Sequence, residues 1–223
     1  MANETVITVQ GEYTARYAAE RALATISIGF EGAERGPVFE LTTDVSDLVR
    51  ERIIELHDPR TGPVTWWASD SVRVWSSKPW NNEGKQLPPV HHSTIEFRVR
   101  FNDFPALARW IEEIALIEGA TIGSIDWDLT DPRRTAVTAE VRSRAVKDAV
   151  SKATVFAQSI GLGTVRAIAL ADPGMLGDQG SALHGGYEEV SGLAMSRSVG
   201  GELSLKPADI EVSASVDARF LAS

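Results

Sequence analysis

Residues 131–163 read DPRRTAVTAEVRSRAVKDAVSKATVFAQSIGLG, and this stretch decides the fold of the chain. Asp131 is placed to cap a helix, Pro132 suits the first helical turn, and Gly161 can adopt the left-handed conformation that ends one. The stretch therefore predicts one long helix over residues 131–160. Between its ends, alanine recurs at every fourth position, at Ala145, Ala149, Ala153 and Ala157. This stripe of methyl groups predicts that another backbone packs closely against one face of the helix.

Alternating hydrophobicity predicts β-strands on both sides of this helix. The strongest alternation runs from Ile210 to Phe220, where apolar residues at even positions are separated by polar ones. Weaker patterns predict strands at residues 5–10, 13–17, 22–31, 64–67, 71–75, 121–129 and 164–171. One more strand is expected to turn four apolar side chains inward, those of Ile95, Phe97, Val99 and Phe101. Its regular polar face indicates an antiparallel sheet with one side in solvent.

Two shorter helices are predicted as well. The first follows a break at residues 32–37 and ends near His57, because Asp58 and Pro59 stop it. Its apolar residues at helical spacing are Leu41, Val45, Leu48, Val49, Ile53 and Leu56. The second is capped by Asp103 and closed by Gly119. The sequence thus predicts an α+β fold, with antiparallel sheets packed by two or three helices that include the alanine-striped helix.

Length and composition are those of a globular protein. The chain has 223 residues, of which 43% are hydrophobic and 24% are charged, so it can form one large domain or two packed lobes. Residues 173–201 contain eight of the 18 glycines. We therefore expect residues 173–205 to form a mobile insertion, since long glycine-rich loops are uncommon inside compact domains.

The charge of the chain argues against several kinds of partner. A net charge of -9 disfavours nucleic acid and anionic membrane surfaces, which both recruit clustered Lys and Arg. No segment approaches the roughly 18 to 20 apolar residues that span a bilayer, so membrane insertion is not expected. The first residues lack the pattern of a secretory signal, which favours a cytoplasmic location. The absence of cysteine excludes disulfides, thiolate metal sites and cysteine nucleophiles.

Three stretches carry a resemblance to a known family. They are ITVQGEYTARYAAERALATISIGFEG at residues 7–32, SRAVKDAVSKATVFAQSIGLGTVRAIALADP at residues 143–173 and DIEVSASVDARFLA at residues 209–222. They resemble the SIMPL domain family, which contains the periplasmic immunogenic proteins and their relatives. The resemblance runs from about Thr5 to Ala222 and is looser in the middle third.

The resemblance implies an α+β fold, a tendency toward large homo-oligomers and no established catalytic residue. We expect no cofactor. Many relatives are exported, and some are linked to stress responses or to kinase signalling. A periplasmic role is not carried over to this chain, because the sequence shows no signal peptide. The family also supplies no purpose for the glycine-rich insertion at residues 173–205.

Two groups of residues suggest site chemistry, and each has a structural explanation. His91 and His92 are adjacent in an extended segment, so they point to opposite faces and cannot easily bind one metal ion. Asp126 and Asp128 share one face of a strand, and Asp131 follows just beyond. Such carboxylates can bind calcium or act as acid and base, but we interpret them as a solvated strand edge and a helix cap.

Tryptophan is concentrated in one part of the chain. Trp66, Trp67, Trp75 and Trp80 fall within 15 residues, and the adjacent pair must face opposite sides of an extended segment. Core packing explains one side, whereas a subunit interface or a ligand groove explains the other. These tryptophans are candidate interface residues together with three residues of the glycine-rich segment, Met175, Tyr187 and Met195.

These observations contain no catalytic constellation, so we expect a protein that is not an enzyme. The preferred hypothesis is a self-assembling homo-oligomer that acts as a scaffold or a partner-binding surface, with a stress-related role suggested by the family. The alternative is a small-molecule-binding protein or an undetected hydrolase, with the loops at residues 78–90 and 173–205 as lids over a pocket. The native mass, measured together with any small molecule that co-purifies, distinguishes the two.

Overall fold

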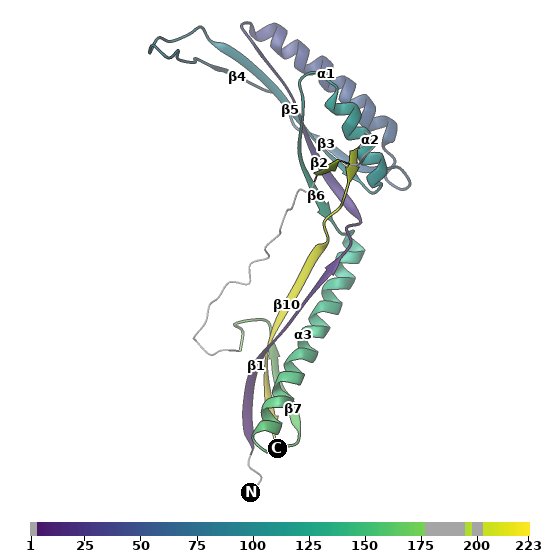
Figure 1. The fold of residues 1–223 in the computed structure, drawn as a ribbon, viewed down its shortest axis with the longest axis vertical. Helices are drawn as coiled ribbons and strands as arrows, with labels where there is room; N and C mark the ends of the chain where they lie inside the picture. The colour runs from purple at the N-terminus through teal and green to yellow at the C-terminus, as the bar shows by residue number, and fades with distance from the viewer. Residues whose placement is uncertain (1–3, 177–194, 198–202) are drawn as a thin grey trace. The chain divides into compact units, whose positions relative to one another are not determined.

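The computed structural model of this chain describes residues 4–176, 195–197 and 203–223. It is an α+β structure with antiparallel sheets, which confirms the predicted fold class. The described residues form two compact units (Figure 1). Unit 1 contains residues 4–18, 129–176 and 209–223, and unit 2 contains residues 19–128, 195–197 and 203–208.

Unit 1 is a three-stranded antiparallel sheet with one long helix against it. The strand order is β1 (Thr5–Tyr17), β10 (Ile210–Ala222) and β7 (Val165–Ala171), and helix α3 (Asp131–Ser159) packs along β1 and β10 (Figure 1). β1 and β10 pair in one unbroken register, from Thr5 opposite Ala222 to Tyr17 opposite Ile210. β1 is therefore a single strand where the sequence predicted two.

The alanine stripe of α3 packs as the sequence predicts. Ala145, Ala149, Ala153 and Ala157 are all buried, with Ile7, Val9 and Phe220 in the same unit. Gly11 on β1 meets this stripe directly, because a Cβ at position 11 would lie 2.7 Å from the backbone nitrogen of Ala149. A residue without a side chain is required at position 11 for strand and helix to approach this closely.

The start of α3 corrects one prediction. Thr130 is the N-cap residue, its side chain makes no capping hydrogen bond, and Asp131 already belongs to the first helical turn. Asp131 is therefore not the cap, although its negative charge near the helix N-terminus interacts favourably with the helix dipole. At the other end, Gly161 has a φ of 80°, which confirms its predicted role in ending the helix.

Unit 2 contains a larger antiparallel sheet covered by two helices. The strand order is β3 (Val64–Ser69), β5 (Val90–Phe101), β2 (Arg21–Gly32) and β6 (Ala120–Asp128), and β4 (Arg73–Ser77) also pairs with β5. Helices α1 (Arg35–Leu56) and α2 (Phe104–Ala115) share one apolar core with the sheet. The four side chains of β5 that were predicted to face inward, at positions 95, 97, 99 and 101, are all buried in this core.

Helix α1 buries most of its predicted apolar residues, because Val49 and Ile53 lie in the core and Val45 and Leu56 pack against it. Its fully buried residues are Val38, Thr42, Ser46, Val49 and Ile53, whereas Leu41 and Leu48, the other two members of the predicted periodic set, are 50% and 41% exposed. Two hydroxyl groups can be buried here because each donates to a carbonyl of the preceding turn. Thr42 donates to Val38 over 2.8 Å, and Ser46 donates to Thr42 over 2.6 Å.

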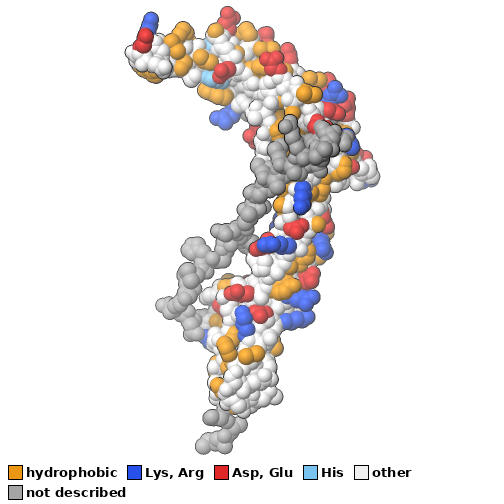
Figure 2. Space-filling model, viewed as in Figure 1, with side chains coloured by type: hydrophobic (Ala, Val, Ile, Leu, Met, Phe, Trp, Pro, Cys, Tyr) orange, Lys and Arg blue, Asp and Glu red, His pale blue; other side chains and the backbone are white. Residues whose placement is uncertain are grey.

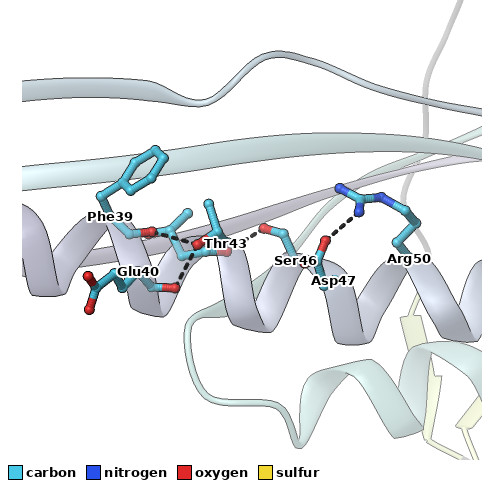
Figure 3. A network of polar contacts seen from close by, with 7 residues as sticks. Phe39, Glu40, Thr43, Ser46, Asp47 and Arg50 are labelled. Carbon is cyan, nitrogen blue, oxygen red and sulfur yellow. Dashed lines mark hydrogen bonds and ion pairs between the residues drawn. The ribbon is translucent and has the colours of Figure 1, made fainter.

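Further polar contacts along α1 stay within the helix (Figure 3). The Thr43 hydroxyl donates to the backbone carbonyls of Phe39 and Glu40 over 3.1 and 2.8 Å. Arg50 forms an ion pair with Asp47, one turn earlier. These hydrogen bonds and this ion pair join residues of α1 to one another.

Helix α2 begins as predicted, because the Asp103 side chain accepts a 2.8 Å hydrogen bond from the backbone N–H of Ala106. The helix ends at Ala115, and Gly119, with a φ of 82°, lies in the turn that leads into β6. Gly119 thus shapes the connection to the next strand and does not close the helix itself.

The glycine-rich segment is partly described. Residues 177–194 and 198–202 lie outside the described residues, so the predicted mobility of the insertion stays a prediction. Between and beyond these ranges, β8 (Met195–Arg197) pairs with β9 (Leu203–Leu205) in an antiparallel hairpin that the sequence did not predict. Leu205 packs against the core of unit 2.

Candidate functional site

The outer face of the unit 2 sheet, opposite α1 and α2, presents two of the candidate tryptophans. Trp66 lies on β3 across from Arg100, whose guanidinium carbon is 5.1 Å from the ring centre, and the indole is 39% exposed. Trp67 is partly buried against the core. The adjacent tryptophans therefore face opposite sides of the strand, as the sequence predicts.

Trp75 lies on the same outer face, in β4. Its ring stacks on the imidazole of His92, with ring centres 5.0 Å apart and an angle of 12° between the ring planes. The guanidinium carbon of Arg73 lies 5.9 Å from the centre of the indole. In Figure 2, pale blue histidine and orange hydrophobic side chains are visible over the hairpin of β4 and β5. Trp80, in the loop after β4, is 66% exposed.

The two histidines lie on opposite faces of β5, as predicted. His92 Nε2 is 2.8 Å from the Ser77 hydroxyl, and His92 Nδ1 is 3.3 Å from a carboxylate oxygen of Glu31. His91 contacts a different serine, since its Nδ1 is 2.8 Å from the hydroxyl of Ser76. Sequence reasoning missed the serine–histidine–glutamate grouping, because only the register of three strands brings these positions together.

The other candidate interface residues come from the segment that follows β7. Met175 follows β7 in unit 1 and is 73% exposed, whereas the tryptophans belong to unit 2. Met195 is the first residue of β8. Tyr187 lies outside the described residues.

The acidic residues near the end of β6 have structural partners. Arg21 binds Asp128 through two guanidinium nitrogens at 3.0 and 2.7 Å, and both side chains are largely buried. Asp126 accepts a 3.1 Å hydrogen bond from the Ser124 hydroxyl. Asp131 lies in the first turn of α3. The ion pair with Arg21 supports a structural role for Asp128, but the side chain is largely buried and so is not part of a solvated strand edge.

The loop between β4 and β5 encloses a shallow, open hollow of about 520 Å³. Its lining belongs to the loop itself and includes Lys78, Asn81, Lys85 and Leu87. This is the loop to which the alternative hypothesis assigns the role of a lid. The role of lid stays a prediction, since the hollow is formed within one loop.

The two outer strands of the unit 1 sheet, β1 and β7, differ in whether side chains bind the backbone groups at their outer edges. On β1, the backbone N–H of Glu12 donates to the Asp148 carboxylate over 2.9 Å, and the Lys152 ammonium donates to the carbonyl of Gln10 over 2.9 Å. Both α3 side chains also pair with each other at 2.8 Å. Helix α3 thus uses charged side chains to bind backbone groups that β1 would otherwise offer to another strand.

These contacts shift the pKa values of both α3 side chains. The hydrogen bond from Lys152, followed by the one from the Glu12 backbone, lowers the pKa of the Asp148 carboxyl. The hydrogen bond to Asp148 raises the pKa of Lys152. Both shifts favour the charged forms, so the pair is ionised across the neutral range.

The edge of β7 is different. β7 pairs with β10, and among the described residues no strand pairs with its other side. Its sequence, VRAIALA, contains a single charged residue, Arg166. Ile168 and Leu170 are 46% and 52% exposed. An apolar edge strand of this kind is a template for pairing with another strand.

Comparison with known proteins identifies one family. The family model SIMPL, described as a protein of unknown function (DUF541), matches residues 7–220. No curated protein matches this chain. Within the part of the chain that the structure describes, no helix is long and apolar enough to cross a membrane.

Proposed function

This chain belongs to the SIMPL family, and on that premise we propose that it acts by self-assembly, as a homo-oligomeric scaffold that presents a partner-binding surface. The family is one of unknown function and names no activity. Assembly requires complementary surfaces and no catalytic group. The outer face of the unit 2 sheet, with its exposed tryptophans, is the proposed partner-binding surface.

The observation that carries this proposal is the outer edge of β7, with which no strand pairs in the part of the chain that the structure describes. A free edge exposes a row of unpaired backbone N–H and C=O groups, and natural proteins usually block such edges with charge, proline or a covering element. The edge of β1 is blocked in this way by Asp148 and Lys152. The edge of β7 has Ile168 and Leu170 exposed beside it instead.

The proposed contact joins β7 of one copy to β7 of a second copy, antiparallel, about a two-fold axis. The same patch is then used on both copies, which is the usual geometry of a symmetric dimer. Backbone hydrogen bonds extend the three-stranded sheet across both copies, and the exposed side chains of Ile168 and Leu170 meet at the junction.

The test is the mass of the protein in solution, measured by light scattering at micromolar concentration. We expect a mass of at least two chains of 24.1 kDa for the parent. Replacing Ile168 or Leu170 with Lys places a charge on the edge and should shift the mass toward that of a single chain. Leu116→Lys is the matched control, because Leu116 is 88% exposed in unit 2 and should leave the mass unchanged.

Two results would contradict the proposal at different levels. A parent that is monomeric at micromolar concentration would exclude self-assembly as the function. An oligomeric parent whose mass is unaffected by both lysine variants would exclude β7 as the contact, and the assembly would then use another surface.

A further inference from the structure

Three chemically complementary side chains meet on the outer face of the unit 2 sheet. The register places Glu31 of β2 directly across from His92 of β5, and His92 directly across from Trp75 of β4. Ser77 follows Trp75 by two positions and therefore shares its face. The result is a line of carboxylate, imidazole and hydroxyl groups drawn from three neighbouring strands.

The two nitrogens of His92 have different partners. An ionised carboxylate can only accept a hydrogen bond, so Glu31 at 3.3 Å favours the tautomer in which His92 carries its proton on Nδ1. Nε2 is then an acceptor, and the Ser77 hydroxyl at 2.8 Å donates to it. At 3.3 Å, Glu31 and His92 are in ion-pair contact, and the hydrogen bonds of a catalytic group often tighten only when substrate binds.

We propose that Ser77 is a nucleophilic serine that His92 activates toward carboxylic esters. Its hydroxyl oxygen forms a bond to the ester carbonyl carbon while its proton passes to His92 Nε2. The bond between that carbon and the leaving oxygen then breaks, and the leaving alcohol takes the proton from His92. Water releases the acyl group from Ser77 in the same way, with His92 again accepting a proton, so the overall reaction is ester hydrolysis.

Two neighbouring residues define the rest of the site. Glu31 is a positioning residue, since it touches the imidazole and not the substrate. Trp75 stacks on His92 and remains 45% exposed, so it holds the imidazole plane and offers a flat apolar surface beside it. That surface suits an ester with an aromatic alcohol part, and the proposed substrates are aryl esters of small carboxylic acids.

The same hairpin contains a matched control. Ser76 and His91 are 2.8 Å apart on the other face, with the same residue types and the same separation. In that pair the serine contacts Nδ1, and among the described residues no carboxylate pairs with the other nitrogen of His91. A serine beside a histidine is thus present twice in this hairpin, but the three-residue arrangement is present on one face.

The size of the expected effect follows from general base catalysis alone, because we assign no group to bind the developing oxyanion. A positioned general base contributes about 10²- to 10⁴-fold to a rate. Ser77 should therefore be acylated about 10²- to 10⁴-fold faster in the parent than in His92→Gln, which removes the base. It should also be acylated faster than Ser76, because no carboxylate pairs with His91 among the described residues. Release of the acyl group by water should be slow, so the acylated protein should accumulate.

The experiment treats the full chain with p-nitrophenyl acetate, follows release of p-nitrophenolate and locates the acetyl group by peptide mass spectrometry. We expect acetylation on Ser77 that is lost in Ser77→Ala and retained in Ser77→Cys, whose thiol is also a nucleophile. Ser76→Ala should react like the parent. His92→Gln should lower the rate by the factor given above, and melting curves should show that each variant is folded.

Glu31 is tested by comparing two variants. Glu31→Gln keeps an oxygen that can accept from His92, so it should retain part of the rate that Glu31→Ala loses. Equal loss in both would assign the effect to charge and would remove the proposed positioning role.

Failure to detect acetyl-Ser77 would overturn the proposal, as would a rate that is the same in Ser77→Ala and the parent. Neither result bears on assembly through β7, because the site lies wholly within unit 2 and its labelling is measured independently of the mass. Equal acetylation of Ser76 and Ser77 would also overturn the proposal, since the pair of His92 and Glu31 would then not increase the reactivity of the neighbouring serine.

Discussion

The Asp148 carboxylate on α3 accepts a 2.9 Å hydrogen bond from the backbone N–H of Glu12, a residue of an outer strand of the sheet. Lys152 completes the contact by donating to the carbonyl of Gln10. Gly11 lies between these two positions and allows β1 to approach Ala149. Helix α3 is therefore fixed to β1 by close packing at one residue and by charged hydrogen bonds at its two neighbours.

Replacing Asp148 with Asn should make the protein less stable at neutral pH and should matter less in acid. The pKa of Asp148 is lowered in the folded protein, so its carboxylate stabilises the fold above its usual pKa of about 3.9. That stabilisation is lost as the pH falls through the lowered pKa. The melting temperatures of parent and variant should differ at about pH 7 and converge near pH 2.

Glu51→Gln on α1 is the matched control for this change, because it removes one exposed negative charge from the other unit. Its effect should be small at both pH values, as for most surface charges. A constant difference in melting temperature between Asp148→Asn and the parent from pH 7 to pH 2 would contradict the ionisation account.

Replacing Ala149 or Ala153 with Leu should overpack the contact between α3 and the sheet. Both alanines are fully buried, and Ala149 faces Gly11 across the closest approach of helix and strand. We expect a cost of about 1–3 kcal/mol in the free energy of unfolding, measured by denaturant titration. Val150→Leu is the control on the same helix, since Val150 is 40% exposed. Unchanged stability in both alanine variants would mean that this helix face is not packed.

Two substitutions of Trp110 should have very different costs. Trp110 is 2% exposed, packs on Phe101 and has no hydrogen-bond partner for its indole N–H among the described residues. Trp110→Ala should lower stability by about 3–5 kcal/mol through the cavity it leaves. Trp110→Phe should cost clearly less, because it removes a buried N–H whose lack of a partner costs about 1–3 kcal/mol. Equal losses in a denaturant titration would show that the N–H is not a penalty.

Replacing residues 176–203 with a short Gly/Ser linker should leave the melting temperature nearly unchanged. The segment is rich in glycine, and loop length by itself alters stability only weakly. Leu205, which packs against the unit 2 core, is retained in this variant. Thermal melting and native mass are measured side by side. Loss of the folded state would show that the hairpin of β8 and β9 is an integral element, whereas unchanged assembly and partner binding would remove an interaction role for the segment.

Much of the fold could be predicted from the sequence because its patterns are periodic and local. The alternation in β10 and β5 and the alanine stripe of α3 each specify one buried face. Capping chemistry located the start of α2 at Asp103. The buried face of α1 was predicted in part: Val49 and Ile53 are in the core, but the sequence pattern did not include Thr42 and Ser46, which are buried with their hydroxyl groups bonded inside the helix. A hydrophobicity pattern assigns polar residues such as Thr42 and Ser46 to the solvent-exposed face of a helix.

The sites were harder to predict, since they depend on which strands are neighbours. Glu31, Ser77 and His92 converge only through the pairing of β2 and β4 with β5, and single-sequence patterns do not specify that pairing. The contrast between the edges of β1 and β7 likewise depends on the strand order of unit 1. The adjacent tryptophans were informative because strand geometry alone requires Trp66 and Trp67 to face opposite sides.

The pairing of β1 with β10 sets the order of events during synthesis. Thr5 pairs with Ala222, so the sheet of unit 1 cannot close until nearly the whole described chain has left the ribosome. Unit 2 has most of its residues in the continuous range 19–128, and its sheet pairs strands from within that range. Unit 2 can therefore fold first. During this time β1 remains unpaired, and its apolar side chains are accessible to solvent. Closing so long a loop is slow, and the delay is the period in which a nascent chain most needs a chaperone.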